Sequence, residues 1–378
     1  MSREGEISPA AASPLEDDDL LTEILLRLPP QPSSLPRASF VCRRWCSLVS
    51  DTGFFRRFRL RHRHSPPLLG FFNEDDFVPN MEAPNRLPYG RFSLPLDREE
   101  DDHWIVGCRH GLVLIFDRCS TTHPVLVVWD PVAGDQHHIA VPAVFDADKI
   151  SLTSGAVLRG AGLVQFQVVL VAADKDRGNG RILAWVYSSD TGVWGDPIAS
   201  LLPSLSSDWL DIYSKPALLV GNSLYWLLIG ASSRILELDL NRQRLAVIPR
   251  PLPVHMIIQL NNLVLCADDG GLGFLFMSGN SIQLRSMKTD CDGVASWVLT
   301  KTYELDKLLP VNYKDLVGIL GFAEYNNVLL LDTYYDGLFM IQLESSKFKK
   351  LSEFHELSPY HAFESVYNAG NSIPKPSY

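Results

Sequence analysis

The stretch LEDDDLLTEILLRLPPQPSSLPRASFVCRRWCSLVSDTGFFRRFRLRH, residues 15–62, differs from the rest of the chain. Its apolar residues recur at every third or fourth position, which is the spacing of an amphipathic helix. The acidic residues 17–19 favour a helix start, because negative charge suits the N-terminal end of the helix dipole. The residues beyond this stretch show the pattern of short strands. The sequence therefore predicts a small helical head attached to a large β domain.

Two apolar stripes and a third helix are predicted within the head. The first helix ends at Pro29 and Pro30, and its stripe contains Leu20, Leu21, Ile24, Leu25 and Leu28. A second helix begins near Ser33 or Ser34, and its stripe contains Ala38, Val41, Trp45 and Leu48. Phe54, Phe55 and Phe58 lead the third helix. Three short helices enclose little core, so the surplus apolar surface favours packing on another chain, with a purely internal core as the alternative.

At these residues the sequence resembles the F-box. The family pattern is a leucine, an acidic opening, a leucine-rich helix closed by Arg-Leu-Pro, and then Val-Cys-Arg/Lys-x-Trp. The matching residues are Leu15, Asp17, Asp18, Asp19, Leu21, Glu23, Ile24, Leu25, Arg27, Leu28, Pro29, Val41, Cys42, Arg43, Arg44 and Trp45. Glu16 stands where the family usually has proline, which affects only the entry turn. The overall style, including the Arg/His-rich end of the head, looks like the large plant F-box families.

The resemblance implies a partner rather than a reaction. F-box domains bind the small adaptor protein of SCF-type (cullin-RING) ubiquitin ligases, and through it the cullin. The rest of such a chain normally binds the protein that is ubiquitylated, and the sequence does not identify that target. The expected adaptor-binding residues are Leu15, Leu20, Leu21, Ile24, Leu28, Pro29, Leu35, Val41, Cys42, Trp45 and Val49. An interaction scaffold that binds the adaptor without directing degradation is the open alternative.

Short apolar runs separated by Gly, Asn, Asp and Pro turns fill the remainder of the chain. Residues 216–248 show the unit as four strands, and related units recur along the sequence. Taking five turn positions as equivalent gives steps of 59, 50, 50 and 55 residues between Asp130, Ser189, Asp239, Thr289 and Glu344. Repeats of about fifty residues with four strands each are typical of a β-propeller. We predict six blades, one of them built from both ends of the domain, with a single β-sandwich as the alternative.

The predicted fold class is therefore multidomain, with a small all-α, three-helix F-box followed by a large all-β domain of about six propeller blades. The expected divisions are a flexible tail over residues 1–14, the F-box over 15–64, a linker and first propeller strand over 65–103, and the propeller over 104–378. The repeats resemble kelch-like and F-box-associated propellers in outline, although the kelch double glycine is absent. The acidic run at residues 99–102 is expected to be a solvated loop.

Charge and composition exclude several function classes. Of the 34 basic and 44 acidic side chains, residues 1–64 carry 10 and 8, so the acidic excess lies in the β domain. An acidic domain binds nucleic acid poorly, because contacts to the phosphates require clustered positive charge on the protein. No apolar run is long enough to span a bilayer. The six scattered cysteines indicate a reducing compartment, and we expect a cytoplasmic or nuclear protein without nucleic-acid or membrane partners.

No catalytic constellation is recognisable in the sequence. Cys42 and Cys46 lie four residues apart on a predicted helix, but no histidine lies nearby in sequence to act as a base. His137 and His138 are adjacent on a predicted strand, where neighbouring side chains point to opposite faces. We expect no catalytic residue, no metal and no cofactor. A propeller enzyme that acts on small molecules is the remaining alternative.

Overall fold

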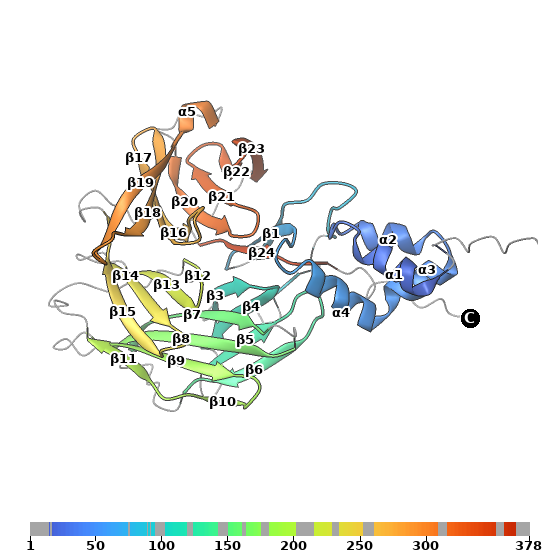
Figure 1. Cartoon of the computed structure of the whole chain (residues 1–378), viewed down its shortest axis with the longest axis horizontal. Coiled ribbons are helices and arrows are strands. Elements are labelled where there is room, and N and C mark those ends of the chain that lie inside the picture. The colour runs from blue at the N-terminus through green and yellow to red at the C-terminus, as the bar shows by residue number, and fades with distance from the viewer. Residues whose placement is uncertain are drawn as a thin grey trace, which may run out of the picture.

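The computed structural model describes most of the chain. The described residues are 15, 17–74, 76–88, 90, 92–94, 103–118, 124–142, 150–160, 164–174, 181–201, 215–228, 234–251, 261–308, 316–352 and 359–367. The predicted tail over residues 1–14 and the acidic run at 99–102 lie outside this set. In Figure 1 a helical head lies at one end of the molecule and a ring of β-sheets forms the remainder.

The head contains the helices α1 (Asp18–Leu26), α2 (Ser34–Ser39), α3 (Arg43–Ser50) and α4 (Thr52–Arg61). Asp17 caps α1, because its carboxylate accepts hydrogen bonds from the backbone N–H groups of Asp19 and Leu20. Asp51 caps α4 in the same way through the N–H of Phe54. The starts of α1 and α4 are therefore set by local side-chain chemistry.

The structure has four helices in the head where the sequence predicted three. The predicted second helix is divided between α2 and α3, because the backbone of Cys42 is extended at φ −164° and ψ 170°. The preceding residues close short turns, in which the N–H of Phe40 donates to the carbonyl of Arg37 and that of Val41 to Ala38. An extended residue cannot continue the helical hydrogen-bond ladder, so a new helix begins at Arg43.

Five sheets of the ring consist of consecutive antiparallel strands, and they are described here in chain order. The first contains β3 (His103–Arg109), β4 (Leu112–Asp117), β5 (Val125–Trp129) and β6 (Gln136–Ala140). The second contains β7 (Ile150–Arg159), β8 (Phe166–Asp174), β9 (Arg181–Ser188), β10 (Val193–Trp194) and β11 (Ile198–Leu201). The third contains β12 (Leu218–Val220), β13 (Ser223–Leu228), β14 (Arg234–Asp239) and β15 (Arg244–Pro249).

The fourth and fifth sheets repeat the same order. The fourth contains β16 (Asn262–Cys266), β17 (Leu272–Ser278), β18 (Ser281–Thr289) and β19 (Ala295–Glu304), after which a short helix follows, α5 (Leu305–Leu308). The fifth contains β20 (Leu316–Ala323), β21 (Val328–Thr333), β22 (Gly337–Gln342) and β23 (Lys347–Ser352). Four of the five equivalent positions predicted from the repeat lie at the end of the third strand of these sheets or directly after it, and Glu344 lies two residues after β22, which confirms the predicted period.

The sixth sheet closes the ring with strands from both ends of the β domain. It has the order β2-β1-β24, formed by β1 (Leu68–Phe72), β2 (Phe77–Pro79) and β24 (His361–Glu364). In Figure 1 β1 and β24 lie side by side although their colours mark opposite ends of the chain. The strand β24 contacts β3 on one side and β20 on the other. This arrangement confirms a six-bladed propeller with one composite blade.

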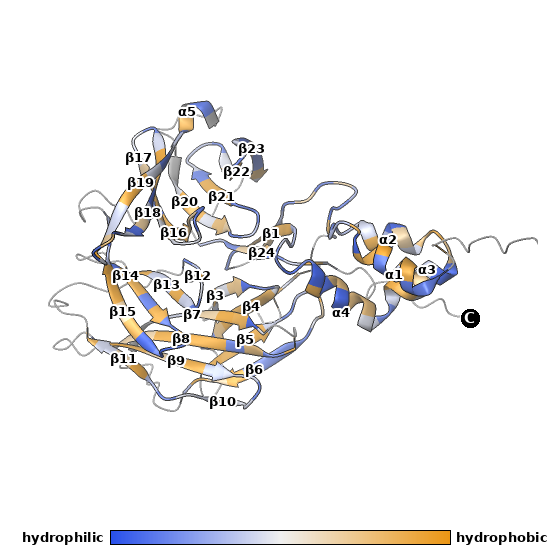
Figure 2. Cartoon of the chain, viewed as in Figure 1, coloured by the Kyte–Doolittle hydropathy of each residue, from blue (hydrophilic) through white to orange (hydrophobic). Residues whose placement is uncertain are grey.

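Neighbouring blades bury their apolar faces against each other. One core cluster joins the second and third sheets through Val169, Ile182, Trp226 and Leu236, which are all nearly inaccessible to solvent. Figure 2 shows the hydrophobic residues along the strands of the ring, whereas β6 and much of α4 are hydrophilic. A single four-stranded sheet would expose both faces, so stacking around a ring supplies the burial that stabilises each blade.

Candidate partner-binding face

Exposed apolar side chains are concentrated on the helical head. Among the described residues, fourteen large apolar side chains are exposed, and five of them belong to the head. We call these five the apolar face, and they are Leu15, Leu20, Ile24, Phe40 and Val41. A soluble protein rarely leaves so many apolar groups together on a unit of about fifty residues unless another molecule covers them.

The α1 contribution to this face comes from one side of the helix. Leu20 is 50% exposed and Ile24 is 39% exposed, and their spacing of four residues places them one turn apart. Leu21 and Leu25 are fully buried in the core of the head. The stripe predicted from the sequence is therefore split lengthwise, with one edge facing solvent and the other facing α4.

The break between α2 and α3 supplies the second part of the face. Phe40 is 88% exposed and Val41 is 60% exposed, and Cys42 beside them is also exposed. On an uninterrupted helix Val41 would lie in the same stripe as Ala38 and would turn inward. The extended backbone at Cys42 ends the helical rotation, so this apolar pair faces solvent.

The remaining predicted adaptor-binding residues lie beside or beneath the apolar face. Pro29 is exposed, and Leu28 and Trp45 are half-buried against the core of the head. Leu35 and Val49 are buried within that core, as is Leu21. These buried side chains shape the face from below and expose almost no surface of their own to a partner.

Phe40 is the one member of the face that the sequence reasoning missed. It lies off the apolar stripe of the predicted second helix, next to the buried Ala38 and after the exposed Arg37. A large aromatic residue outside the stripe of an amphipathic helix was the available signal. Helical periodicity by itself could not show that the helix stops at this point.

Ion pairs align the helices that carry the face. Arg44 of α3 donates to the Asp18 carboxylate at 2.6 Å and to the backbone carbonyl of Leu15 at 2.6 Å. Arg57 of α4 donates to Glu23 of α1 at 2.8 Å. These contacts place the start of α3 next to the start of α1. Because the pairs are exposed, they orient the helices more than they stabilise them.

The head is also fixed to the ring. Arg59 of α4 donates to the Asp130 carboxylate at 3.2 Å, and Arg159 from the next blade donates to the same oxygen at 2.7 Å. Val366, which follows β24, packs into the core of the head, and Phe55 of α4 packs against the core of the composite blade. The head therefore has a defined orientation relative to the propeller, and in Figure 1 the helices α1, α2 and α3 lie at the end of the molecule away from the ring.

Neither a metal-binding group of side chains nor a membrane-spanning helix is found among the described residues. Within the described ranges, no group of three or more His, Cys, Asp or Glu side chains is placed to hold a metal ion. No helix in that part of the chain is long and apolar enough to cross a membrane. Burial raises the pKa of the Cys108 thiol far above its usual range, which opposes formation of a thiolate.

Comparison with protein families matches both parts of the chain. The F-box domain family matches residues 17–57, and the family described as F-box protein AT5G49610-like, beta-propeller, matches residues 104–363. The chain belongs to this AT5G49610-like family of F-box propeller proteins. The F-box and the propeller predicted from the sequence are thereby confirmed.

Two plant proteins that are similar to this chain are named for an F-box. The chain is 24% identical over 235 residues to the F-box/kelch-repeat protein At3g61590 of Arabidopsis thaliana, covering 60% of this chain and 54% of that protein. It is 28% identical over 235 residues to a second protein of that plant named for an F-box, At3g23970, covering 55% of this chain and 53% of that protein. The chain thus matches about half the length of each relative.

Solved structures are only distantly similar to this chain. The Dos1 propeller aligns at a TM-score of 0.37 with 10% identity, covering 70% of this chain and 62% of that one. TolB from Acinetobacter baumannii aligns at 0.39 with 11% identity, covering 81% and 69%. Scores this low do not decide the architecture, which rests on the sheet order and on the family match.

Proposed function

We propose that this protein is the substrate-recognition subunit of an SCF-type (cullin-RING) ubiquitin ligase. The apolar face of the F-box binds the adaptor protein, and through it the cullin, while the propeller binds a target protein. The observation that carries the proposal is the exposed apolar face on a domain whose family is the F-box. The chain then acts by bringing two proteins together, and the transfer of ubiquitin is the work of other subunits.

The exposed members of the predicted site make the direct contacts in this proposal. They are Leu15, Leu20, Ile24, Pro29, Val41 and Cys42, to which the structure adds Phe40. Leu28 and Trp45 are half-buried, and the exposed parts of their side chains add to the surface that contacts the adaptor. Leu21, Leu35 and Val49 act by holding the helices in place, because a partner cannot reach their side chains. Apolar anchors of this kind carry most of the binding energy at a protein interface.

The proposal assigns a role to each part of the chain. Residues 15–64 dock on the adaptor, residues 65–103 connect the domains and supply two strands of the composite blade, and residues 104–378 recognise the target. The rigid junction at Asp130 and Val366 holds the target at a fixed orientation to the ligase. This role places the protein in the cytoplasm or the nucleus.

A binding experiment with matched aspartate variants tests the adaptor-binding role. Ile24→Asp introduces a charge into the apolar face, whereas Val193→Asp makes the same kind of change at a residue on β10 that is also exposed. Loss of one anchor is expected to cost about 2 kcal/mol, or roughly 30-fold in the dissociation constant for the adaptor. The Val193→Asp variant should bind the adaptor like the unmodified chain.

Recovery of adaptor and cullin on the immobilised full-length protein gives the measurement. Equal recovery with Ile24→Asp and the unmodified chain would contradict the proposed docking face. The ligase role requires in addition that proteins captured by the propeller are ubiquitylated in the reconstituted complex. Capture that is unchanged by Ile24→Asp, combined with loss of ubiquitylation, is the expected result. Ubiquitylation that persists without adaptor binding would refute it.

A further inference from the structure

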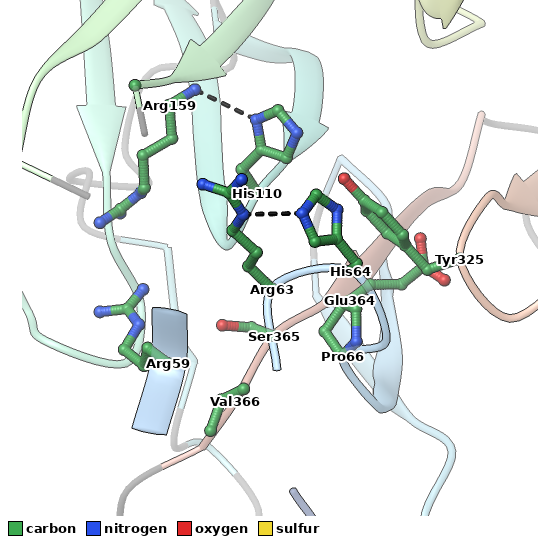
Figure 3. Close-up of a pocket in the computed structure, with 11 residues that line it drawn as sticks. Arg59, Arg63, His64, Pro66, His110, Arg159, Tyr325, Glu364, Ser365 and Val366 are labelled. Carbon is green, nitrogen blue, oxygen red and sulfur yellow. Dashed lines mark hydrogen bonds between the residues drawn. The ribbon is translucent and has the colours of Figure 1, made fainter. Parts of the chain in front are cut away.

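A cavity of about 250 Å³ lies where the end of the F-box meets the propeller. Its wall combines the end of α4 and the following residues with the turns of three blades and the segment after β24. Figure 3 shows the side chains that project around it, and those used below are Arg59, Arg63, His64, His110, Arg159 and Tyr325. The volume equals that of roughly eight water molecules in the liquid, which is enough for a small organic molecule.

The lining of this cavity is rich in positive charge. Arg59 and Arg159 both line the cavity, and both donate to the carboxylate of Asp130. The Nε of Arg63 lies 2.8 Å from Nε2 of His64, and no carboxylate among the described residues forms an ion pair with Arg63. The whole chain has a net charge of −10, and its acidic excess lies in the β domain. The cavity between the F-box and the propeller is nevertheless lined by basic side chains.

His110 occupies the base of the cavity as a neutral imidazole. Its Nδ1 accepts a hydrogen bond from the backbone N–H of Arg159 at 3.1 Å, which leaves Nε2 as the N–H donor. Burial, and after it the nearby charges of Arg109, Arg159 and Arg63, lower the pKa of His110 to about 4.

Glu364 is the one carboxyl group among the described residues that line the cavity, and it opposes an anion only weakly. Burial raises the pKa of Glu364 to about 7, so this group is partly protonated at neutral pH. Its Oε1 already accepts hydrogen bonds from the backbone N–H of Asn326 at 2.9 Å and from the Asn326 side chain at 2.8 Å. Tyr325 and Val366 supply apolar surface beside these polar groups.

We propose that this cavity binds a small organic anion through a phosphate or carboxylate group. Arg63 and His64 contact the anionic group from the rim, and Nε2 of His110 donates from the base. A guanidinium group presents parallel N–H donors that match the oxygens of either group. The ligand would touch the F-box end, three blades and the C-terminal segment at once, so its binding would reinforce the junction. This inference is independent of the adaptor-binding role.

Isothermal titration of the full-length protein with pyrophosphate and, separately, with citrate tests the site at constant ionic strength. The matched variants are Arg63→Gln and Arg61→Gln, which both remove an exposed arginine near the end of α4, although only Arg63 lines the cavity. Loss of one charge-assisted contact should weaken binding at least ~10-fold in Arg63→Gln. Arg61→Gln should remain within about two-fold of the unmodified chain, because long-range attraction is screened by salt.

The outcomes separate the sources of the anion. Saturable one-to-one binding that is tighter for pyrophosphate supports a phosphate-bearing ligand, and tighter binding of citrate supports a carboxylate. Failure of both probes to bind saturably would overturn the proposal. Equal weakening by Arg61→Gln and Arg63→Gln would also overturn it, since nonspecific attraction by the basic helix end would then explain the binding. A thermal unfolding measurement confirms that both variants are folded.

Discussion

The strongest test of the junction between the F-box and the propeller is the substitution Asp130→Asn. One oxygen of Asp130 accepts from the backbone N–H groups of Val132 at 3.1 Å and Ala133 at 3.0 Å. The other accepts from Arg159 at 2.7 Å and Arg59 at 3.2 Å. Burial by itself raises the pKa of Asp130, but the two arginines and the backbone N–H of Ala133 together outweigh burial and hold its pKa below the usual range. The ionised carboxylate is thus a central element of the folded junction.

The asparagine variant keeps the shape of the side chain and removes its charge. The side chain of Asp130 is 7% exposed and that of Arg159 is 8% exposed, so solvent replaces little of the lost interaction. Breaking a buried ion pair costs 3–5 kcal/mol in other proteins, and we expect a loss of about 3 kcal/mol in the free energy of unfolding. Asp135→Asn is the control, because Asp135 lies in the same turn but is exposed, and it should change stability by less than ~0.5 kcal/mol.

Urea unfolding at neutral pH measures both variants. A loss below about 1 kcal/mol in Asp130→Asn, or one equal to that of Asp135→Asn, would refute the reasoning. The pH dependence gives a second check. Because the pKa of Asp130 is lowered, its contribution is present above the ordinary value of 3.8 and is lost as the pH falls through the folded-state pKa. The difference between the unmodified chain and Asp130→Asn should therefore shrink as the pH falls below 3.8.

Two leucines next to each other on α1 should respond in opposite ways to truncation. Leu21→Ala should lower the free energy of unfolding by about 3 kcal/mol, because it leaves a cavity in the core of the head. Leu20→Ala should change it by less than ~0.5 kcal/mol and weaken adaptor binding instead, and equal destabilisation in urea would contradict the assigned burial. The raised pKa of Glu364 means that its stabilising contribution is complete below pH 4.5 and is lost as the pH rises through about 7. Glu364→Gln should therefore gain stability relative to the unmodified chain as the pH rises from 4.5 to 7. The gain in the free energy of unfolding should reach about 3 kcal/mol at pH 8. A difference between the two proteins that does not change with pH would show that Glu364 does not titrate in this range.

Local chemistry in the sequence was sufficient to predict the start of α1 and the strand repeat, whereas the start of α3 at Arg43 was not predicted. The Asp17 cap depends on atoms within three residues of it, and so does the Asp51 cap. The strand period appears as a repeated alternation of apolar runs and turns, because every blade must bury the same inner strands. The sequence alone therefore placed the end of the third strand to within two residues in the five blades built from consecutive strands.

The partner-binding face could be predicted only in part. Leu20, Leu21, Ile24 and Leu25 lie within one broad apolar arc of the helix, so periodicity could not divide them into buried and exposed residues. Packing against α4 and the segment after β24 made that division, because Phe58 and Val366 cover one edge of the arc. The exposure of Phe40 depends on the helix break at the extended Cys42, which helical periodicity does not show.

The sequence by itself determined that this protein has an F-box head and a propeller of repeated four-stranded units. Each of these features is encoded by residues that lie close together in the chain. Only the tertiary structure decided which apolar residues remain available to a partner, and that Arg63, His110, Arg159 and Glu364 surround one cavity. Those four residues are dispersed along three hundred positions of the chain, and closure of the ring by β24 brings them together. No local pattern records contacts made at that separation.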